Sequence, residues 1–146
     1  MKHIVTSLAA LSLLSVSAPG FAGLRMVPAA SGHAFSYSEA GKFDVFDNHV
    51  CAGDTASRSW ATPLILPINT GTASVYQFTG GGSNAKSAAF SFRTNGSVYS
   101  WTGSWTSNGS VGTVSIPING TVFVRSLLSH PLDDAKGCLY SFKVLY

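Results

Sequence analysis

The densest group of potential ligands in the sequence consists of Asp44, Asp47, His49 and Asp54. On an extended strand Asp47 and His49 would point to the same side, as a metal site or a general base with its carboxylate would require. The group has neither a His-x-His pair nor the spacing of a calcium-binding loop. We therefore predict a strand that ends in a polar loop, with no metal bound there.

A second cluster, formed by Ser129, His130, Asp133 and Asp134, precedes Cys138. It contains the residue types of a hydrolase triad, but a triad is defined by geometry and not by adjacency in a loop. The sequence also lacks the G-x-S-x-G pattern of a nucleophile elbow. We interpret the cluster as a solvated turn, and keep a small secreted hydrolase using His49 or His130 as the second alternative function.

Residues 80–87 nearly match the phosphate-binding loop G-x-x-x-x-G-K-[ST], but Ala85 stands where the second glycine belongs. That mechanism needs a helix directly after the loop, so that its first amides face the phosphates. Residues 88–92 instead read Ala-Ala-Phe-Ser-Phe, an alternation typical of a strand. The segment is therefore predicted to be a glycine-rich connection between strands, and we expect no cofactor.

Tryptophan is the remaining residue type that could contact a ligand, at positions 60, 101 and 105. Trp105 precedes the Asn108-Gly109 pair among hydroxyl side chains, and such a ring could stack on a sugar. The alternative is that this ring packs over the bare backbone of Gly112. We predict Trp105, Trp60 and Asn108 as ligand-contacting residues.

The elements that would position these residues are marked by three Asn-Gly pairs, Asn95-Gly96, Asn108-Gly109 and Asn119-Gly120. Asn-Gly favours a two-residue type I′ hairpin turn, in which both residues have positive φ. The pairs predict a meander of about four antiparallel strands in the second half of the chain.

A register count from these turns predicts which side chains meet. It places Phe90 opposite Trp101 and Phe92 opposite Tyr99, and then Trp101 opposite Ile116. The third turn places Phe123 opposite Ile116, but it also brings Arg125 onto the same face. The predicted core face consists of Phe90, Phe92, Tyr99, Trp101, Val114, Ile116 and Ile118.

Beyond residue 22 the sequence shows no helical periodicity and is rich in Gly, Ser, Thr, Val and aromatic residues. We predict an all-β fold, a single antiparallel β-sandwich of the jelly-roll or Ig-like type. The expected strands are 34–39, 43–51, 64–68, 73–79, 87–93, 97–105, 110–116, 121–127 and 139–145.

The first 22 residues read as a cleaved secretory signal peptide, with Lys2, an apolar stretch from Ile4 to Val16 and small residues at Gly20 and Ala22. The sandwich domain would then span residues 23–146, without a membrane span, in the periplasm or secreted. In such a compartment Cys51 and Cys138 are expected to form a disulfide.

Charge limits the function classes. The chain has a net charge of +3 with only 10% charged residues, too little for a nucleic-acid-binding surface. No carboxylate occurs between Thr55 and Leu132, which leaves that stretch poor in groups for acid-base catalysis. The sequence therefore predicts an exported non-enzymatic binding module that recognises a glycan or protein surface through hairpin loops. The first alternative is a structural or assembly subunit of a surface appendage or complex, which would pair through an edge strand and could form an oligomer. The alternating residues 139–145 motivate this alternative.

Overall fold

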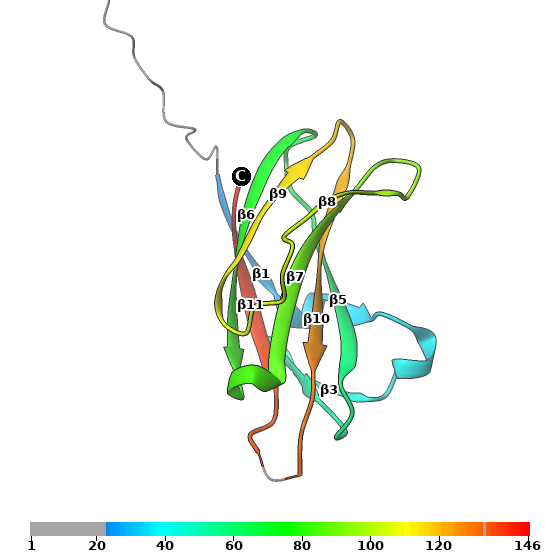
Figure 1. Cartoon of the computed structure of the whole chain (residues 1–146), viewed down its shortest axis with the longest axis vertical. Helices are drawn as coiled ribbons and strands as arrows, with labels where there is room; N and C mark the ends of the chain where they lie inside the picture. Colours follow the sequence, from blue (N-terminus) through cyan, green and yellow to red (C-terminus); the bar gives the residue numbers. More distant parts are fainter. Residues whose placement is uncertain (1–22, 133) are drawn as a thin grey trace, which may run out of the picture.

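The computed structural model describes residues 23–132 and 134–146, so the predicted signal peptide lies outside the described residues. Over this part of the chain, two antiparallel sheets pack face to face (Figure 1). The predicted β-sandwich is confirmed. Its only helical elements among the described residues are three single 3₁₀ turns, namely η1 (Ala29–Ser31), η2 (Tyr37–Glu39) and η3 (Gly82–Asn84).

The first sheet has the strand order β3-β4-β11-β6-β9, and β1 also pairs with β11. Its strands are β1 (Leu24–Pro28), β3 (Phe43–Val45), β4 (Val50–Ala52), β6 (Gly71–Gly80), β9 (Gly109–Ile116) and β11 (Cys138–Leu145). The second sheet has the order β2-β5-β10-β7-β8. Its strands are β2 (His33–Ala34), β5 (Arg58–Leu64), β7 (Ala85–Phe92), β8 (Val98–Trp101) and β10 (Thr121–Leu128).

Only the first Asn-Gly pair joins two hydrogen-bonded strands, β7 and β8. The turn has three residues, because Arg93 and Ser97 close it with an N–H···O bond of 2.9 Å and only Gly96 has positive φ, at 80°. Phe92 therefore pairs with Val98 and not with Tyr99 as predicted. A register shift beyond this pair restores the predicted pairing of Phe90 with Trp101.

The other two Asn-Gly pairs carry the chain from one sheet to the other, so the predicted meander is wrong there. Strand β9 pairs with β6, and β10 pairs with β5 and β7. Phe123 consequently lies opposite Phe90, not opposite Ile116. Each pair has positive φ at one residue only, Gly109 or Asn119, whereas a type I′ hairpin turn needs it at both.

The space between the sheets is filled by small and medium side chains. The inner positions of β7 are Ala85, Ser87, Ala89 and Ser91, all fully buried. The largest fully buried apolar side chains are Phe142, Leu128, Leu139, Val50, Val75, Val114, Val124 and Val144. The core is thus mainly aliphatic, with Phe142, Trp60 and Phe43 as its aromatic members, and it contains serine hydroxyls that need internal partners.

The predicted core face is therefore only partly right. Val114 and Ile116 are buried, but Tyr99 and Trp101 are each 45% exposed and Ile118 is 72% exposed. The two sheets approach too closely at this edge to admit aromatic rings. Ser91 of β7 donates from Oγ to the carbonyl oxygen of Ser115 in β9, across 2.6 Å.

The predicted disulfide is present and joins Cys51 of β4 to Cys138 of β11. The two residues are direct cross-strand partners with their Cα atoms 4.1 Å apart. The bridge connects positions separated by 87 residues. A loop of that size corresponds to roughly 4–5 kcal/mol of stabilisation in the chain-entropy model.

Strand β11 lies inside the first sheet, with β6 on one side and β1 and β4 on the other. The alternating residues 139–145 that motivated the edge-strand alternative therefore belong to a central strand. Their alternation reflects the two sides of a sheet and offers no free backbone edge.

Candidate functional site: an aromatic face on the second sheet

On strands β7, β8 and β10, the second sheet carries its phenylalanines and Trp101 on the side that faces away from the first sheet, whereas Trp60 of β5 is buried on the inner side. On β7 Phe90 and Phe92 alternate with the buried Ala89 and Ser91, and on β10 Phe123 alternates with buried valines. We call this surface the aromatic face; it consists of Phe35, Phe90, Phe92, Val98, Trp101, Trp105, Phe123 and Arg125.

Its rings form a continuous stacked row. Phe90 stacks on Trp101 with 5.7 Å between ring centroids and 10° between planes, and Phe92 stacks on Phe123 at 4.8 Å and 12°. Phe90 and Phe123 are 5.7 Å apart, and Phe35 adds a tilted contact to Phe123 at 6.4 Å. Such contacts hold the rings in fixed positions, because each ring is packed by its neighbours.

The row remains accessible to solvent. Phe35 and Trp101 are each 45% exposed, and Val98 is 49% exposed. A shallow hollow of about 270 Å³ lies between them, lined by Phe35, Phe90, Phe92, Val98, Phe123 and Arg125. A second hollow of about 210 Å³ shares Phe35 and Phe123 with it and is lined by His33, Phe35, Ala61, Pro63 and Phe123. The face therefore offers two neighbouring apolar depressions.

Arg125 lies within this face and is half-buried. Its guanidinium carbon stands 4.2 Å from the ring centroid of Phe35 and 5.9 Å from that of Trp105. Its Nε and Nη2 donate to the hydroxyl oxygen of Ser59, at 3.2 and 2.8 Å. The two aromatic contacts and the serine fix the orientation of the planar group.

Carboxylates are absent from the strands of this sheet, β2, β5, β7, β8 and β10. The two ion pairs found among the described residues, Arg58–Asp54 at 2.7 Å and Lys136–Asp44, do not involve Arg125. The hydrogen bond from Arg58 lowers the pKa of Asp54. Positive charge on the aromatic face is therefore not neutralised by an ion pair within the described part of the chain.

The three predicted ligand-contacting residues lie in different environments. Trp105 is half-buried at the border of the aromatic face, 6.4 Å from Phe90 between ring centroids. Asn108 is exposed, but its Oδ1 accepts the Gly109 N–H at 2.9 Å and so supports its own turn. Trp60 is only 5% exposed and donates from Nε1 to the Ala29 carbonyl at 2.9 Å. Its burial leaves Trp60 unable to contact a ligand at the surface.

The alternative explanation for Trp105 was cover for the Gly112 backbone. Thr102 occupies that place, because a Cβ added at Gly112 would come within 2.9 Å of Thr102 Cγ2. The ring of Trp105 is directed at Phe90 and Arg125 instead.

The predicted ligand cluster around His49 is held by packing. The His49 ring stacks on Phe46 at 4.3 Å and contacts Tyr140 at 5.2 Å, and its Nδ1 lies 2.7 Å from the Asn48 Oδ1. Among residues 23–132 and 134–146, no group of three or more His, Cys, Asp or Glu side chains could hold a metal ion.

The second predicted cluster is a turn with internal hydrogen bonds. Asp134 accepts from Asn84 Nδ2 at 2.8 Å and from the Ala135 N–H at 2.7 Å. These bonds, the Asn84 bond first, lower the pKa of Asp134. Asp133 lies outside the described residues, and none of the hydrogen bonds found in the described part of the chain joins Ser129 Oγ to His130.

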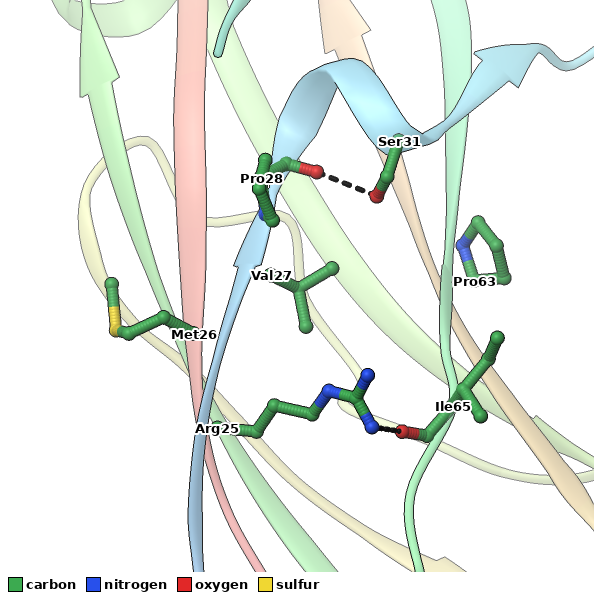
Figure 2. A pocket seen from close by; sticks show the side chains of 7 residues that line it. All are labelled: Arg25, Met26, Val27, Pro28, Ser31, Pro63 and Ile65. Carbon is green, nitrogen blue, oxygen red and sulfur yellow. Dashed lines mark hydrogen bonds between the residues drawn. The ribbon is translucent and has the colours of Figure 1, made fainter.

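Another hollow, of about 190 Å³, lies at the seam between the sheets, where β1 faces the end of β5 (Figure 2). Arg25 reaches across it and donates to the Ile65 carbonyl at 2.6 Å, while Ser31 donates to the Pro28 carbonyl at 2.7 Å. Both polar side chains are thus already bonded to backbone. These residues therefore connect the two sheets, and the hollow offers a ligand little beyond apolar contact.

Sequence reasoning missed Phe35, Phe123 and Arg125 as partners of Trp105. The strand pairings bring them together from distant positions, with Phe123 opposite Phe90 and β2 beside β5. The one signal in the sequence was the alternation of aromatic and serine residues at 90–92, which marks two faces but does not say which one is buried.

Comparisons of the chain with models of known protein families and with curated proteins found no match. Within residues 23–132 and 134–146, none of the helical elements is long and apolar enough to cross a membrane.

Proposed function

We propose that this chain is an exported, non-enzymatic binding module whose aromatic face contacts the surface of a partner protein. The observation that carries the proposal is the stacked row of Phe35, Phe123, Phe92, Phe90 and Trp101, in which Phe35 and Trp101 are exposed and the three rings between them are half-buried. Contiguous apolar patches of this kind commonly mark interaction sites. Aromatic residues and arginine are also the residue types enriched at the centres of protein interfaces.

A protein partner is favoured over a glycan by the lining of the two hollows. A sugar needs several hydrogen-bonding groups around each stacking ring, because its hydroxyls lose water on binding. The hollows offer His33 and Arg125 as their only polar side chains. An apolar side chain from another protein needs no such partners, and it fits a phenylalanine-lined depression.

The signal-like first 22 residues and the Cys51–Cys138 disulfide support a periplasmic or secreted location. A disulfide-braced sheet also provides the rigid scaffold that a binding face needs, because ordering the face before binding lowers the entropic cost of association.

The proposal is tested with the mature chain, residues 23–146, applied to a peptide array and to a glycan array. Phe90→Ser and Trp101→Ser should reduce peptide binding at least tenfold, since central aromatic contacts dominate interface energies. Ile118→Ser is the matched control, because Ile118 is 72% exposed and lies outside the aromatic face. Binding that is absent from both arrays, or that survives both substitutions unchanged, would contradict the proposal.

The alternative of an assembly subunit would need a free edge strand, and β1 is one of the available edges. Its five residues end in Pro28, and Arg25 ties its side chain to the Ile65 carbonyl. Proline, a charged side chain and short length are features that discourage edge-to-edge pairing. Size-exclusion chromatography of residues 23–146 should show a monomer, and a concentration-dependent oligomer would revive this alternative.

A further inference from the structure

Arg125 has N–H donors without a hydrogen-bond partner among the described residues, and these donors indicate the chemistry of the binding partner. Its Nε and Nη2 are bonded to Ser59 Oγ, while none of the hydrogen bonds found in the described part of the chain comes from Nη1. A guanidinium group presents five N–H donors and cannot lose its charge at ordinary pH. Part of its donor capacity is therefore available to a ligand.

The surroundings of Arg125 make an anion the natural ligand. Phe35 and Trp105 lie against the guanidinium and shield it partly from water, which strengthens an ionic contact made there. Lys86 and Arg93, also on the second sheet or at its turn, add positive charge, and the sheet's strands contain no carboxylate. Two carboxylates from outside these strands do contact β5, since Asp54 pairs with Arg58 and Glu39 Oε1 accepts the Ser59 N–H at 3.2 Å. Neither of them is bonded to Arg125 among the described residues, which leaves its guanidinium for a ligand carboxylate.

Arg125 also forms part of the lining of the apolar hollow of about 270 Å³. One ligand could thus fill the hollow with an apolar side chain and place a carboxylate on the guanidinium. The neighbouring hollow, which shares Phe35 and Phe123 with the first, extends the apolar contact.

We propose that the aromatic face recognises an acidic segment of a partner protein, in which an aromatic or aliphatic side chain occupies the hollow and an adjacent Asp or Glu pairs with Arg125. This inference rests on the proposed binding function and adds the charge and chemistry of the partner. Charge-assisted, bidentate arginine–carboxylate contacts are stronger and more directional than neutral hydrogen bonds.

The test uses an array of ten-residue synthetic peptides, each with a central Leu, Phe or Trp. Each peptide is made in three versions, with flanking Asp, with flanking Asn, and with flanking Lys. The acidic version should bind the wild-type chain about tenfold more tightly than the amide version, as expected for one desolvated charged contact. Binding constants are measured by fluorescence anisotropy at fixed salt, because surface ionic contacts are screened.

Two arginine variants locate the effect. Arg125→Gln should reduce the preference for acidic over amide peptides to less than twofold, and Arg125→Lys should retain part of it. Arg25→Gln is the control, because Arg25 lies at the seam shown in Figure 2 and should leave the preference unchanged. Circular dichroism confirms that each variant is folded before its binding is compared.

Each outcome decides a different claim. Peptide binding that depends on Phe90 and Trp101 but ignores the acidic residues would overturn the inference and leave the binding function standing. Binding of a glycan or a single-stranded oligonucleotide through Phe90 and Trp101, with no peptide bound, would overturn both this inference and the proposed protein partner. An acidic preference that survives Arg125→Gln would also overturn the inference, and absence of binding to every probe would remove the proposed function itself.

Discussion

The two faces of the second sheet share one backbone but differ in the size of their side chains. Toward the first sheet, β7 presents Ala85, Ser87, Ala89 and Ser91, and β10 presents valines, serine and leucine. Toward solvent, the same two strands present Phe90, Phe92 and Phe123. The side chains of the inner face pack against the first sheet, and the aromatic side chains of the outer face lie outside the core.

On β7 and β10 the aromatic side chains therefore lie outside the core, whereas Trp60 and Phe142 lie within it. The serines on the inner face allow close approach, as the 2.6 Å bond from Ser91 to the Ser115 carbonyl demonstrates. The outer rings recover part of their burial by stacking on one another, so their exposure costs less than that of isolated rings. We therefore expect that stability and recognition can be changed independently, and four measurements test this expectation.

The largest effect is expected from the disulfide, which lies in the first sheet and away from the aromatic face. Replacing Cys51 and Cys138 together by alanine should lower the free energy of unfolding by about 2–5 kcal/mol. Urea titration followed by circular dichroism measures this loss. Peptide binding by the folded double variant at 25 °C should stay unchanged, and a parallel loss of affinity would show that the two properties are coupled.

A pair of truncations compares the two faces of the second sheet directly. Leu128→Ala on the inner face should cost about 2–5 kcal/mol, because Leu128 is fully buried and the change leaves a cavity. Phe92→Ala on the outer face should cost about 1 kcal/mol, since its ring is only half-buried. Both are measured by urea unfolding, and equal costs would contradict the proposed division.

The inner serines allow a smaller effect to be resolved. The hydroxyls of Ser87 and Ser126 are buried and lie 2.7 Å apart. Either single Ser→Ala change should cost about 1 kcal/mol, because it leaves the other hydroxyl without its partner. The double change should cost less than the sum of the two, and strict additivity in a double-mutant cycle would mean that the pair makes no net contribution.

The smallest effect concerns acid sensitivity, which should arise away from the aromatic face. The pKa of Asp134 is lowered in the folded chain by its bonds to Asn84 and to the Ala135 N–H. Its stabilising contribution is therefore present above the ordinary carboxyl pKa of 3.8 and is lost as the pH falls through the lowered folded value.

Thermal unfolding between pH 6 and pH 2 should show a shallower acid-induced decrease in Asp134→Asn than in the parent chain. Arg125→Gln should leave the slope unaffected, because Arg125 belongs to neither of the two ion pairs found in the described residues. A change of slope in that variant instead would place an acid-sensitive contact on the aromatic face.

The sequence was sufficient to predict those features that depend on local chemistry or on few choices. Two cysteines behind an export-like segment allow one pairing, and the sandwich follows from short β-forming runs without helical periodicity. The pairing of Phe90 with Trp101 was also predicted correctly, although a longer turn and a register shift compensate each other to give it. Its agreement therefore came from two errors that cancel.

The orientation of the aromatic strands could not be predicted, because alternation defines two faces without assigning either to the core. Hydrophobicity alone would place the phenylalanines in the core. The inner position is instead taken by Ser91, whose hydroxyl bonds to the Ser115 carbonyl of the facing sheet. The aromatic face also depends on pairings between distant segments, which place Phe35 and Arg125 in contact. Turn sequences alone contain no information on either point.

The central position of β11 has a consequence for the order of folding. The first sheet cannot be completed until residues 138–145 are available, since β1, β4 and β6 all pair with them. The pairing of Leu24 with Leu145 closes nearly the whole described chain in one contact. Topologies dominated by such remote contacts fold in about milliseconds to seconds, far more slowly than helical bundles. The native first sheet should accordingly form only after the last strand of the chain has been added to it.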